Sequence, residues 1–89
     1  DYRSIKLGKY TEHLIAKRSG KLKAINNIIL ASVARSAGAP LDKGAGVLLH
    51  KHVGDKIQKG EKLMSIYAES KYKLSIALKL LNEKLPLVY

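Results

Sequence analysis

The alternation of apolar and polar residues predicts that the chain begins with two short strands. Residues 10–18, YTEHLIAKR, carry β-branched and aromatic side chains with partial alternation. Residues 21–25, KLKAI, place Leu22 on the opposite face from its two lysine neighbours. Ser19-Gly20 provides a turn signal between the two segments. We therefore expect two strands joined at this turn.

A helix follows, because the apolar positions change to helical spacing. Asn26 or Asn27 suits the N-cap, since its side-chain oxygen can accept hydrogen bonds from the unpaired N–H groups of the first turn. Gly38 suits the left-handed residue that ends a helix, and Pro40 prevents continuation. The apolar stripe between these signals consists of Ile29, Leu30, Val33, Ala34 and Ala37.

The second half of the chain predicts more strands. Residues 47–53, VLLHKHV, are apolar enough for a largely buried strand. Residues 62–68, KLMSIYA, form a final strand, with Leu63, Ser65 and Tyr67 on one face and Met64, Ile66 and Ala68 on the other. Ile57 lies in a short strand between them. Two turn signals enclose Ile57, at Gly54-Asp55 and Gly60-Glu61.

A second helix is expected from residue 71 to about 84, with Ser70 as its N-cap. Pro86 ends it, and residues 87–89 form either an edge strand or a tail. The apolar stripe of this helix consists of Leu74, Ala77, Leu78, Leu81 and Leu85. The predicted order is β-β-α-β-β-β-α, an α+β fold with one domain over residues 1–89.

The composition indicates what class of protein this is and in which compartment it is expected. The chain has 89 residues, of which 46% are hydrophobic and 27% charged, which is typical of a globular domain. It has no cysteine, so it has no disulfide, thiolate metal site or thiol nucleophile, and we expect a cytoplasmic protein. No apolar run approaches the roughly 18 residues of a membrane span. Because the chain opens with Asp1 and its single methionine is Met64, we expect a domain excised from a longer protein.

The net charge of +10 raises the possibility of nucleic-acid binding. Only Arg3, Arg18 and Arg35 could contact phosphate or guanine in a bidentate manner, because the other cations are lysines. The lysines are evenly spread, and the chain has no Phe or Trp for base stacking. The pattern favours a solvated lysine-rich surface, with an RNA-binding module as an alternative.

Two motifs invite a chemical interpretation that the sequence does not favour. Gly44-Ala45-Gly46 lacks the third glycine of a dinucleotide fingerprint and runs from a helix into a strand, so a tight return is the simpler interpretation. His50 and His52 would share one face of the predicted strand, as two metal ligands do, but a third ligand would have to come from His13 or a carboxylate.

No cysteine nucleophile or serine elbow is present, and the acidic residues are far apart in sequence. We therefore predict no catalytic, cofactor-binding or metal-binding residue. The glycines are assigned to structural turns, namely Gly38, Gly44, Gly46, Gly54 and Gly60.

Residues 34–70, ARSAGAPLDKGAGVLLHKHVGDKIQKGEKLMSIYAES, resemble the C-terminal domain of thymidine and pyrimidine-nucleoside phosphorylases. The likeness is strongest to the archaeal-type branch that includes AMP phosphorylase. It is carried by the AGAP-DKGAG loop, the LH strand, the VGDKIQKGE double turn and the IYAES ending. Residues 6–26, KLGKYTEHLIAKRSGKLKAIN, also fit as the preceding strands.

The resemblance implies an α/β-hammerhead, related to the barrel-sandwich fold of biotinyl and lipoyl carriers. It implies an enzyme that uses phosphate to cleave the N-glycosidic bond of a nucleoside or nucleotide. Phosphate and nucleoside would be bound by other domains of the protein, so no catalytic residue carries over to this sequence. The implied partners are the α/β domain of the same chain and further copies in a homo-oligomer, with no cofactor and no membrane.

A biotinyl or lipoyl carrier is a further alternative suggested by VGDKIQKGEKL, residues 53–63. Carriers place the modified lysine at a hairpin tip. Lys71 instead stands at the start of a predicted helix.

Overall fold

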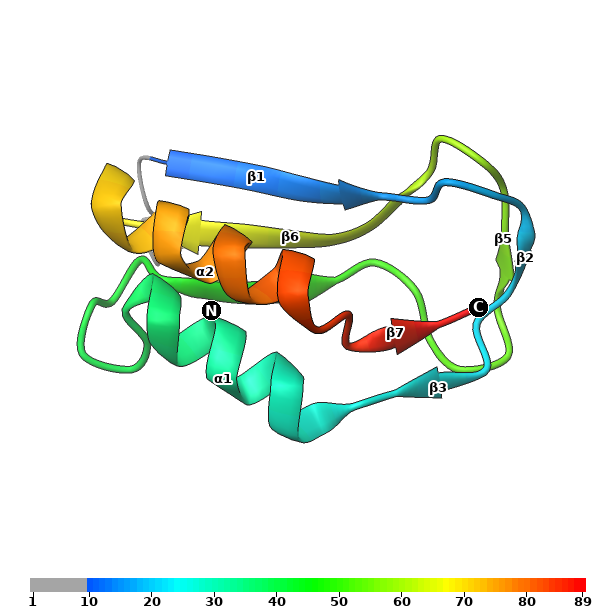
Figure 1. The fold of residues 1–89 in the computed structure, drawn as a ribbon, viewed down its shortest axis with the longest axis horizontal. Coiled ribbons are helices and arrows are strands. Elements are labelled where there is room, and N and C mark those ends of the chain that lie inside the picture. The colour runs from blue at the N-terminus through cyan, green and yellow to red at the C-terminus, as the bar shows by residue number, and fades with distance from the viewer. Residues whose placement is uncertain (1–9) are drawn as a thin grey trace.

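The structure is a computed structural model that describes residues 10–89. A three-stranded sheet lies over two helices, and short strand pairs gather at one end (Figure 1). The elements in chain order are β1 (Tyr10–Ile15), β2 (Gly20–Lys21), β3 (Ala24–Ile25), α1 (Asn27–Ala37), β4 (Gly46–Leu49), β5 (Lys56–Ile57), β6 (Lys62–Ala68), α2 (Lys71–Glu83) and β7 (Leu87–Val88). This arrangement confirms the α+β class.

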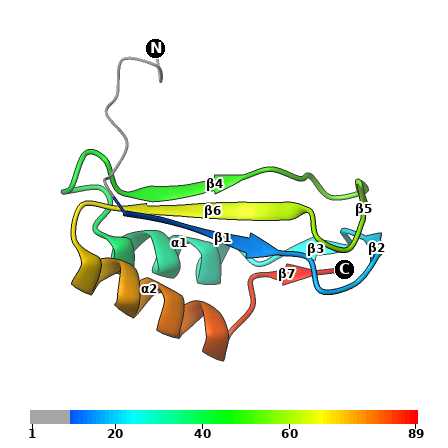
Figure 2. The ribbon, with the colours of Figure 1, turned by 90° about the horizontal axis from the view of Figure 1, so that it is seen from above.

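The three-stranded sheet is antiparallel in the order β1-β6-β4. Both helices lie on the same side of it (Figure 2), with α1 against β4 and β6, and α2 against β6 and β1. The register places Ser65 of β6 between His13 of β1 and Leu48 of β4. The central strand is almost completely buried, from Leu63 to Ile66.

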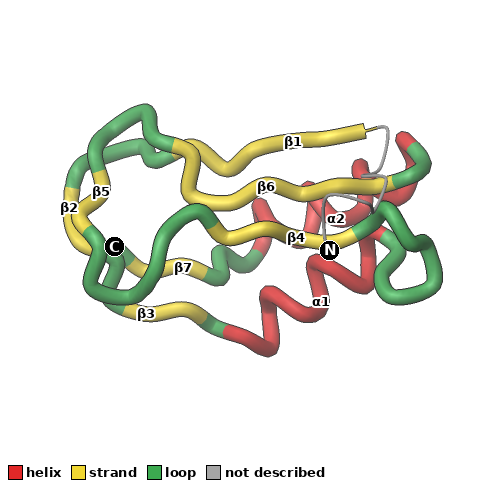
Figure 3. The backbone as a smooth tube through the Cα atoms, turned by 180° about the vertical axis from the view of Figure 1, so that it is seen from behind, coloured by secondary structure: helices red, strands yellow, loops and turns green. Residues whose placement is uncertain are grey.

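The predicted strand over residues 21–25 is divided into β2 and β3, and neither piece pairs with β1. β2 pairs with β5 and β3 pairs with β7, at the end of the molecule away from the helices (Figure 3). The chain bends between the pieces because Leu22 N–H donates to Asp55 O while Lys23 N–H donates to Val88 O. Residues 87–88 are thus a strand, which settles the open choice between strand and tail.

Two other strands are shorter than predicted. β1 ends at Ile15 rather than residue 18. Its pairing strand β6 begins only at Lys62, after the turn at Gly60, and the register shifts between Leu14 and Ile15. β4 covers Gly46–Leu49 rather than residues 47–53. Beyond it the chain turns, where the Asp55 carboxylate accepts a hydrogen bond from His52 N–H at 2.7 Å.

The helix ends follow the capping signals. Asn26 Oδ1 accepts from Ile28 N–H at 3.0 Å and from Ile29 N–H at 3.1 Å, which caps α1. Gly38, with φ 125°, ends α1 and donates to Arg35 O. Ser70 Oγ accepts from Lys73 N–H at 3.1 Å and caps α2. These predictions are confirmed.

The core lies between the sheet and the helices and extends to the small strand pairs. Its buried side chains are Ala16, Leu22, Val33, Ala37, Ile57, Leu63, Met64, Ile66, Ala68, Ala77, Leu81 and Leu87. Leu85 was expected in the α2 stripe but is 48% exposed, because α2 already ends at Glu83. Within residues 10–89, no helix is long and apolar enough to cross a bilayer.

Candidate functional site

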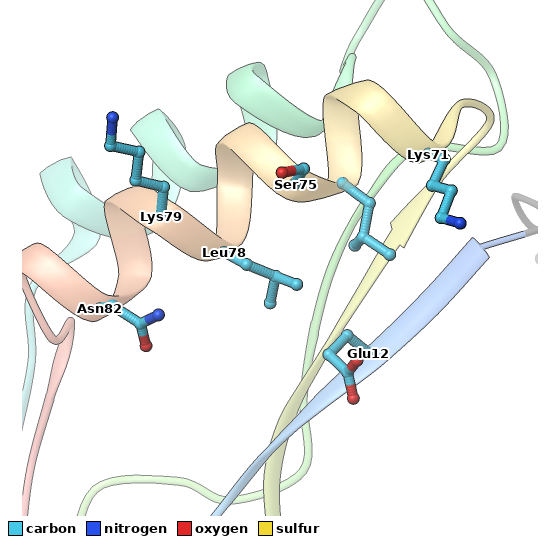
Figure 4. Close-up of a pocket in the computed structure, with 7 residues that line it drawn as sticks. Glu12, Lys71, Ser75, Leu78, Lys79 and Asn82 are labelled. Carbon is cyan, nitrogen blue, oxygen red and sulfur yellow. The ribbon is translucent and has the colours of Figure 1, made fainter.

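A groove of about 460 Å³ lies between α2 and the edge strand β1 (Figure 4). Glu12 projects into it from β1, and its register partner Ile66 is buried on the helix side of the sheet. Leu78 extends from α2 toward the strand. The lining residues are Glu12, Lys71, Leu74, Ser75, Leu78, Lys79 and Asn82.

A second hollow of about 380 Å³ also includes Asn82 and lies at the far end of β1. Tyr89 forms part of its wall. Arg18 Nη2 donates to Tyr89 O at 2.7 Å, and the guanidinium lies 5.3 Å from the centre of the tyrosine ring. Lys17 N–H donates to Tyr89 Oη at 3.0 Å. These contacts hold β7 and the residue after it against the end of β1.

The groove and the second hollow are basic at their rims and apolar below. Lys71 and Lys79 border the first, and Lys17 and Arg18 border the second. Glu12 is the carboxylate among the residues that line the first groove. Leucines of β1 and α2 supply the apolar part, and Leu14, Leu74 and Leu78 are packed against the core while remaining partly accessible.

Two histidines meet at one buried serine. His13 Nδ1 lies 2.6 Å and His50 Nε2 lies 2.7 Å from Ser65 Oγ, and Ser65 is fully buried. Because a hydroxyl has one hydrogen, Ser65 can donate to only one of two neutral imidazoles and must accept from the other. The cluster therefore joins β1, β6 and the end of β4.

The expectation that His50 and His52 share a strand face is wrong. β4 ends at Leu49, and His52 lies in the following turn, where its Nδ1 is 3.6 Å from Asp55 Oδ2. The structure brings His13 to His50 instead. Among residues 10–89, no three His, Cys, Asp or Glu side chains gather as metal ligands. Ser65 is enclosed, so a substrate could not reach it as a nucleophile.

The Gly44-Ala45-Gly46 loop is held by carboxylates of the chain itself. Gly44 N–H donates to Glu69 Oε1 at 3.0 Å. Asp42, at the start of the same return, accepts from Lys73 Nζ at 2.6 Å. The loop is therefore tied to the beginning of α2, and an amide that could face a phosphate is already engaged.

The assigned turn glycines differ in backbone conformation. Gly44 is not among those with positive φ, whereas the others have φ of 125° at Gly38, 153° at Gly46, 99° at Gly54 and 93° at Gly60. A Cβ at Gly38 would overlap the Asp42 carboxylate, while nothing lies near a Cβ at Gly54. Gly38 thus has a packing requirement that Gly54 lacks.

An ion pair supports the second of the two turns around Ile57. Lys51 Nζ lies 2.8 Å from Glu61 Oε2, and Gln58 N–H donates to Glu61 Oε1 at 2.6 Å. These contacts lower the pKa of Glu61 below its ordinary value of 4.5. The hydrogen bond from Lys51 has the largest effect, and the hydrogen bond from Gln58 N–H has the next largest.

Residues 21–87 match the family described as pyrimidine nucleoside phosphorylase C-terminal domain. The chain belongs to this family. It is 42% identical over 87 residues to AMP phosphorylase of Methanococcoides burtonii, and the aligned region covers 98% of this chain and 17% of the relative. It is 42% identical over 82 residues to a Legionella pneumophila protein named "Putative thymidine phosphorylase", and this aligned region covers 92% of this chain and 16% of the relative.

A third relative is AMP phosphorylase of Thermofilum pendens, with 38% identity over 84 residues that cover 94% of this chain and 16% of the relative. The phosphorylase C-terminal domain described here thus spans about one-sixth of the length of these relatives. The family resemblance found in residues 34–70 is confirmed.

Neither the groove nor the histidine cluster was found from the sequence. His13 and Ser65 are far apart along the chain, and they meet only through the pairing of β1 with β6. The groove likewise depends on how α2 lies beside β1. Without known strand pairing, no sequence signal identifies these neighbours.

Proposed function

We propose that residues 1–89 form the C-terminal accessory domain of a nucleoside or nucleotide phosphorylase in the cytoplasm, a pentosyltransferase. The parent reaction uses phosphate to cleave the N-glycosidic bond, releasing the base and a pentose 1-phosphate. The observation that carries this proposal is the family match over residues 21–87. In this view the domain packs against the rest of the chain and supports assembly, and the chemistry belongs to the remaining five-sixths.

Three features of the described residues support an accessory role. Ser65 is enclosed by His13 and His50, so this Ser–His contact is closed to substrate. Gly44 N–H is engaged by Glu69. The two hollows beside β1 are open grooves with leucine floors rather than sites with converging acid–base groups. We also infer that the sheet and short strand pairs correspond to an α/β-hammerhead.

The decisive experiment deletes this domain from the full-length protein. Assembly size and phosphorolysis of AMP, thymidine and uridine are then compared with the intact protein. Loss of higher-order assembly with turnover retained would support the accessory role. Collapse of turnover in an unchanged assembly would overturn it, because the domain would then shape the active cleft. If the intact protein cleaves none of the three substrates, the phosphorylase assignment itself fails.

The two alternatives have less support. Lys71 is the first residue of α2, not a hairpin tip, which disfavours a carrier of biotin or lipoate. An unchanged intact mass after coexpression with a biotin or lipoate ligase would exclude it. The net charge of +10 favours polyanion binding, but a true RNA-binding module would retain a sequence or shape preference as salt is raised.

A further inference from the structure

We propose that the groove between β1 and α2 is the docking site for an acidic, strand-forming segment supplied by the remainder of the phosphorylase chain. This inference rests on the function proposed above, and it identifies the surface through which the accessory domain packs. The occupant is an extended segment that lies beside β1, with apolar side chains toward α2 and carboxylates toward the basic rims.

The backbone arrangement favours an extended occupant. β1 is an edge of the three-stranded sheet, and α2 runs alongside it (Figure 2). A segment that adds to a strand edge gains main-chain hydrogen bonds, while every second side chain points into the adjoining hollow. Leu74 and Leu78 from α2 form the apolar wall that such side chains would contact.

The charges select an acidic occupant. Lys71 and Lys79 border the groove, and no salt bridge engages either of them within the described part of the chain. Lys17 and Arg18 continue the basic rim into the second hollow. A second copy of this chain fits poorly, because each copy carries a net charge of +10 and like charges at an interface are unfavourable.

Glu12 makes the groove selective. A charge that points inward on an edge strand discourages indiscriminate strand pairing. An apolar strand from another protein would bury this carboxylate unpaired, which is costly. An occupant with one basic or hydrogen-bonding residue opposite Glu12 avoids that cost. The groove therefore attracts acidic side chains through its rim lysines and disfavours purely apolar strands through Glu12.

The source follows from the length of the relatives. This chain covers 17% of AMP phosphorylase of Methanococcoides burtonii, so most of such a protein lies outside it. A segment tethered to the domain is present at an effective concentration that can reach millimolar, so a short strand and a few charge contacts are enough to hold it.

Photo-crosslinking in the full-length protein tests the occupant directly. Benzoylphenylalanine replaces Ser75, which lines the groove, and in a control replaces Tyr72, which is 73% exposed on the same helix but does not line it. We expect position 75 to link, within one chain, to an acidic segment outside residues 1–89. Position 72 should not reach that segment. Links from position 75 only to a second copy, only within residues 1–89, or to no peptide would overturn the proposal.

Charge reversal gives an independent test. Lys71→Glu with Lys79→Glu is compared with Lys23→Glu and Lys84→Glu, a control with the same change in net charge outside the groove. In the full-length protein, we expect amide hydrogen exchange of β1 to accelerate about tenfold in the groove variant only. Equal exchange in both variants would overturn the proposal.

The two proposals can fail separately. If the crosslink and exchange results are negative while deletion of the domain still abolishes assembly, the accessory role stands and the docking surface lies elsewhere. If deletion changes neither assembly nor turnover, the accessory role fails whatever occupies the groove.

Discussion

Lys73 Nζ lies 2.6 Å from Asp42 Oδ2 and joins the first turn of α2 to the loop after α1. The Asp42 side chain is 20% exposed and that of Lys73 is 43% exposed, so solvent only partly screens the pair. The neighbouring contact from Gly44 N–H to Glu69, which lies between β6 and the N-cap of α2, ties the same loop to the segment that leads into α2. The loop between α1 and β4 is therefore positioned by α2.

Breaking this ion pair should destabilise the domain modestly. We expect Asp42→Asn to lower the free energy of unfolding by about 1 kcal/mol, because a partly exposed pair is only slightly stronger than a surface pair. Urea unfolding measures the change, with Glu83→Gln on the exposed face of α2 as the control. The double variant Asp42→Asn with Lys73→Met measures the coupling between the two residues. If its loss of unfolding free energy equalled the sum of the losses of the two single variants, the residues would not be coupled.

Two glycines should differ in their sensitivity to alanine. Gly54→Ala meets only the strain of φ 99°, and we expect a loss of about 1 kcal/mol. Gly38→Ala meets φ 125° and also the Asp42 carboxylate, so we expect a loss of about 2–4 kcal/mol. Thermal and urea unfolding provide the comparison. Equal losses would show that Asp42 moves aside without cost.

The Ser65 hydroxyl should determine which ring nitrogen carries the proton in His13 and in His50. At neutral pH we expect His13 Nδ1 and His50 Nε2 to differ, one carrying a proton and the other accepting from Ser65. Nitrogen-15 NMR distinguishes the two forms. Ser65→Ala should shift the nitrogen signals of both rings, because each ring loses its hydrogen-bond partner, and lower the free energy of unfolding by about 1 kcal/mol. The same protonation at both nitrogens in the unaltered protein would contradict the hydrogen bonding described here.

The lowered pKa of Glu61 makes its contribution to stability depend on pH. Since the folded pKa is below the unfolded value of 4.5, the contribution is fully present above pH 4.5 and is lost as pH falls through the folded pKa. Glu61→Gln should therefore be less stable than the unaltered chain near neutral pH. The difference in unfolding free energy should narrow as the pH is lowered below 4.5. A difference that stays constant down to strongly acidic pH would show that the Lys51 contact does not favour the charged form.

Local signals in the sequence were sufficient for the helices. Asn26 and Gly38 delimit α1 where capping chemistry predicted, because each cap depends on residues within one turn. The segment over residues 21–25 could not be predicted in the same way. Its two pieces pair with β5 and β7, which lie far along the chain, and those partners determine where it bends.

By itself the sequence determined the α+β class and the helix ends, and the likeness of residues 34–70 pointed to the family. The class and the helix ends depend on periodicity, capping and turn chemistry, which act between near neighbours, whereas the family was indicated by resemblance alone. Only the tertiary structure decided that His13 reaches His50 through Ser65, that His52 does not, and that β1 and α2 form a basic groove with a leucine floor. These relationships follow from strand register and helix placement, which are set by packing between distant segments rather than by any short stretch of residues.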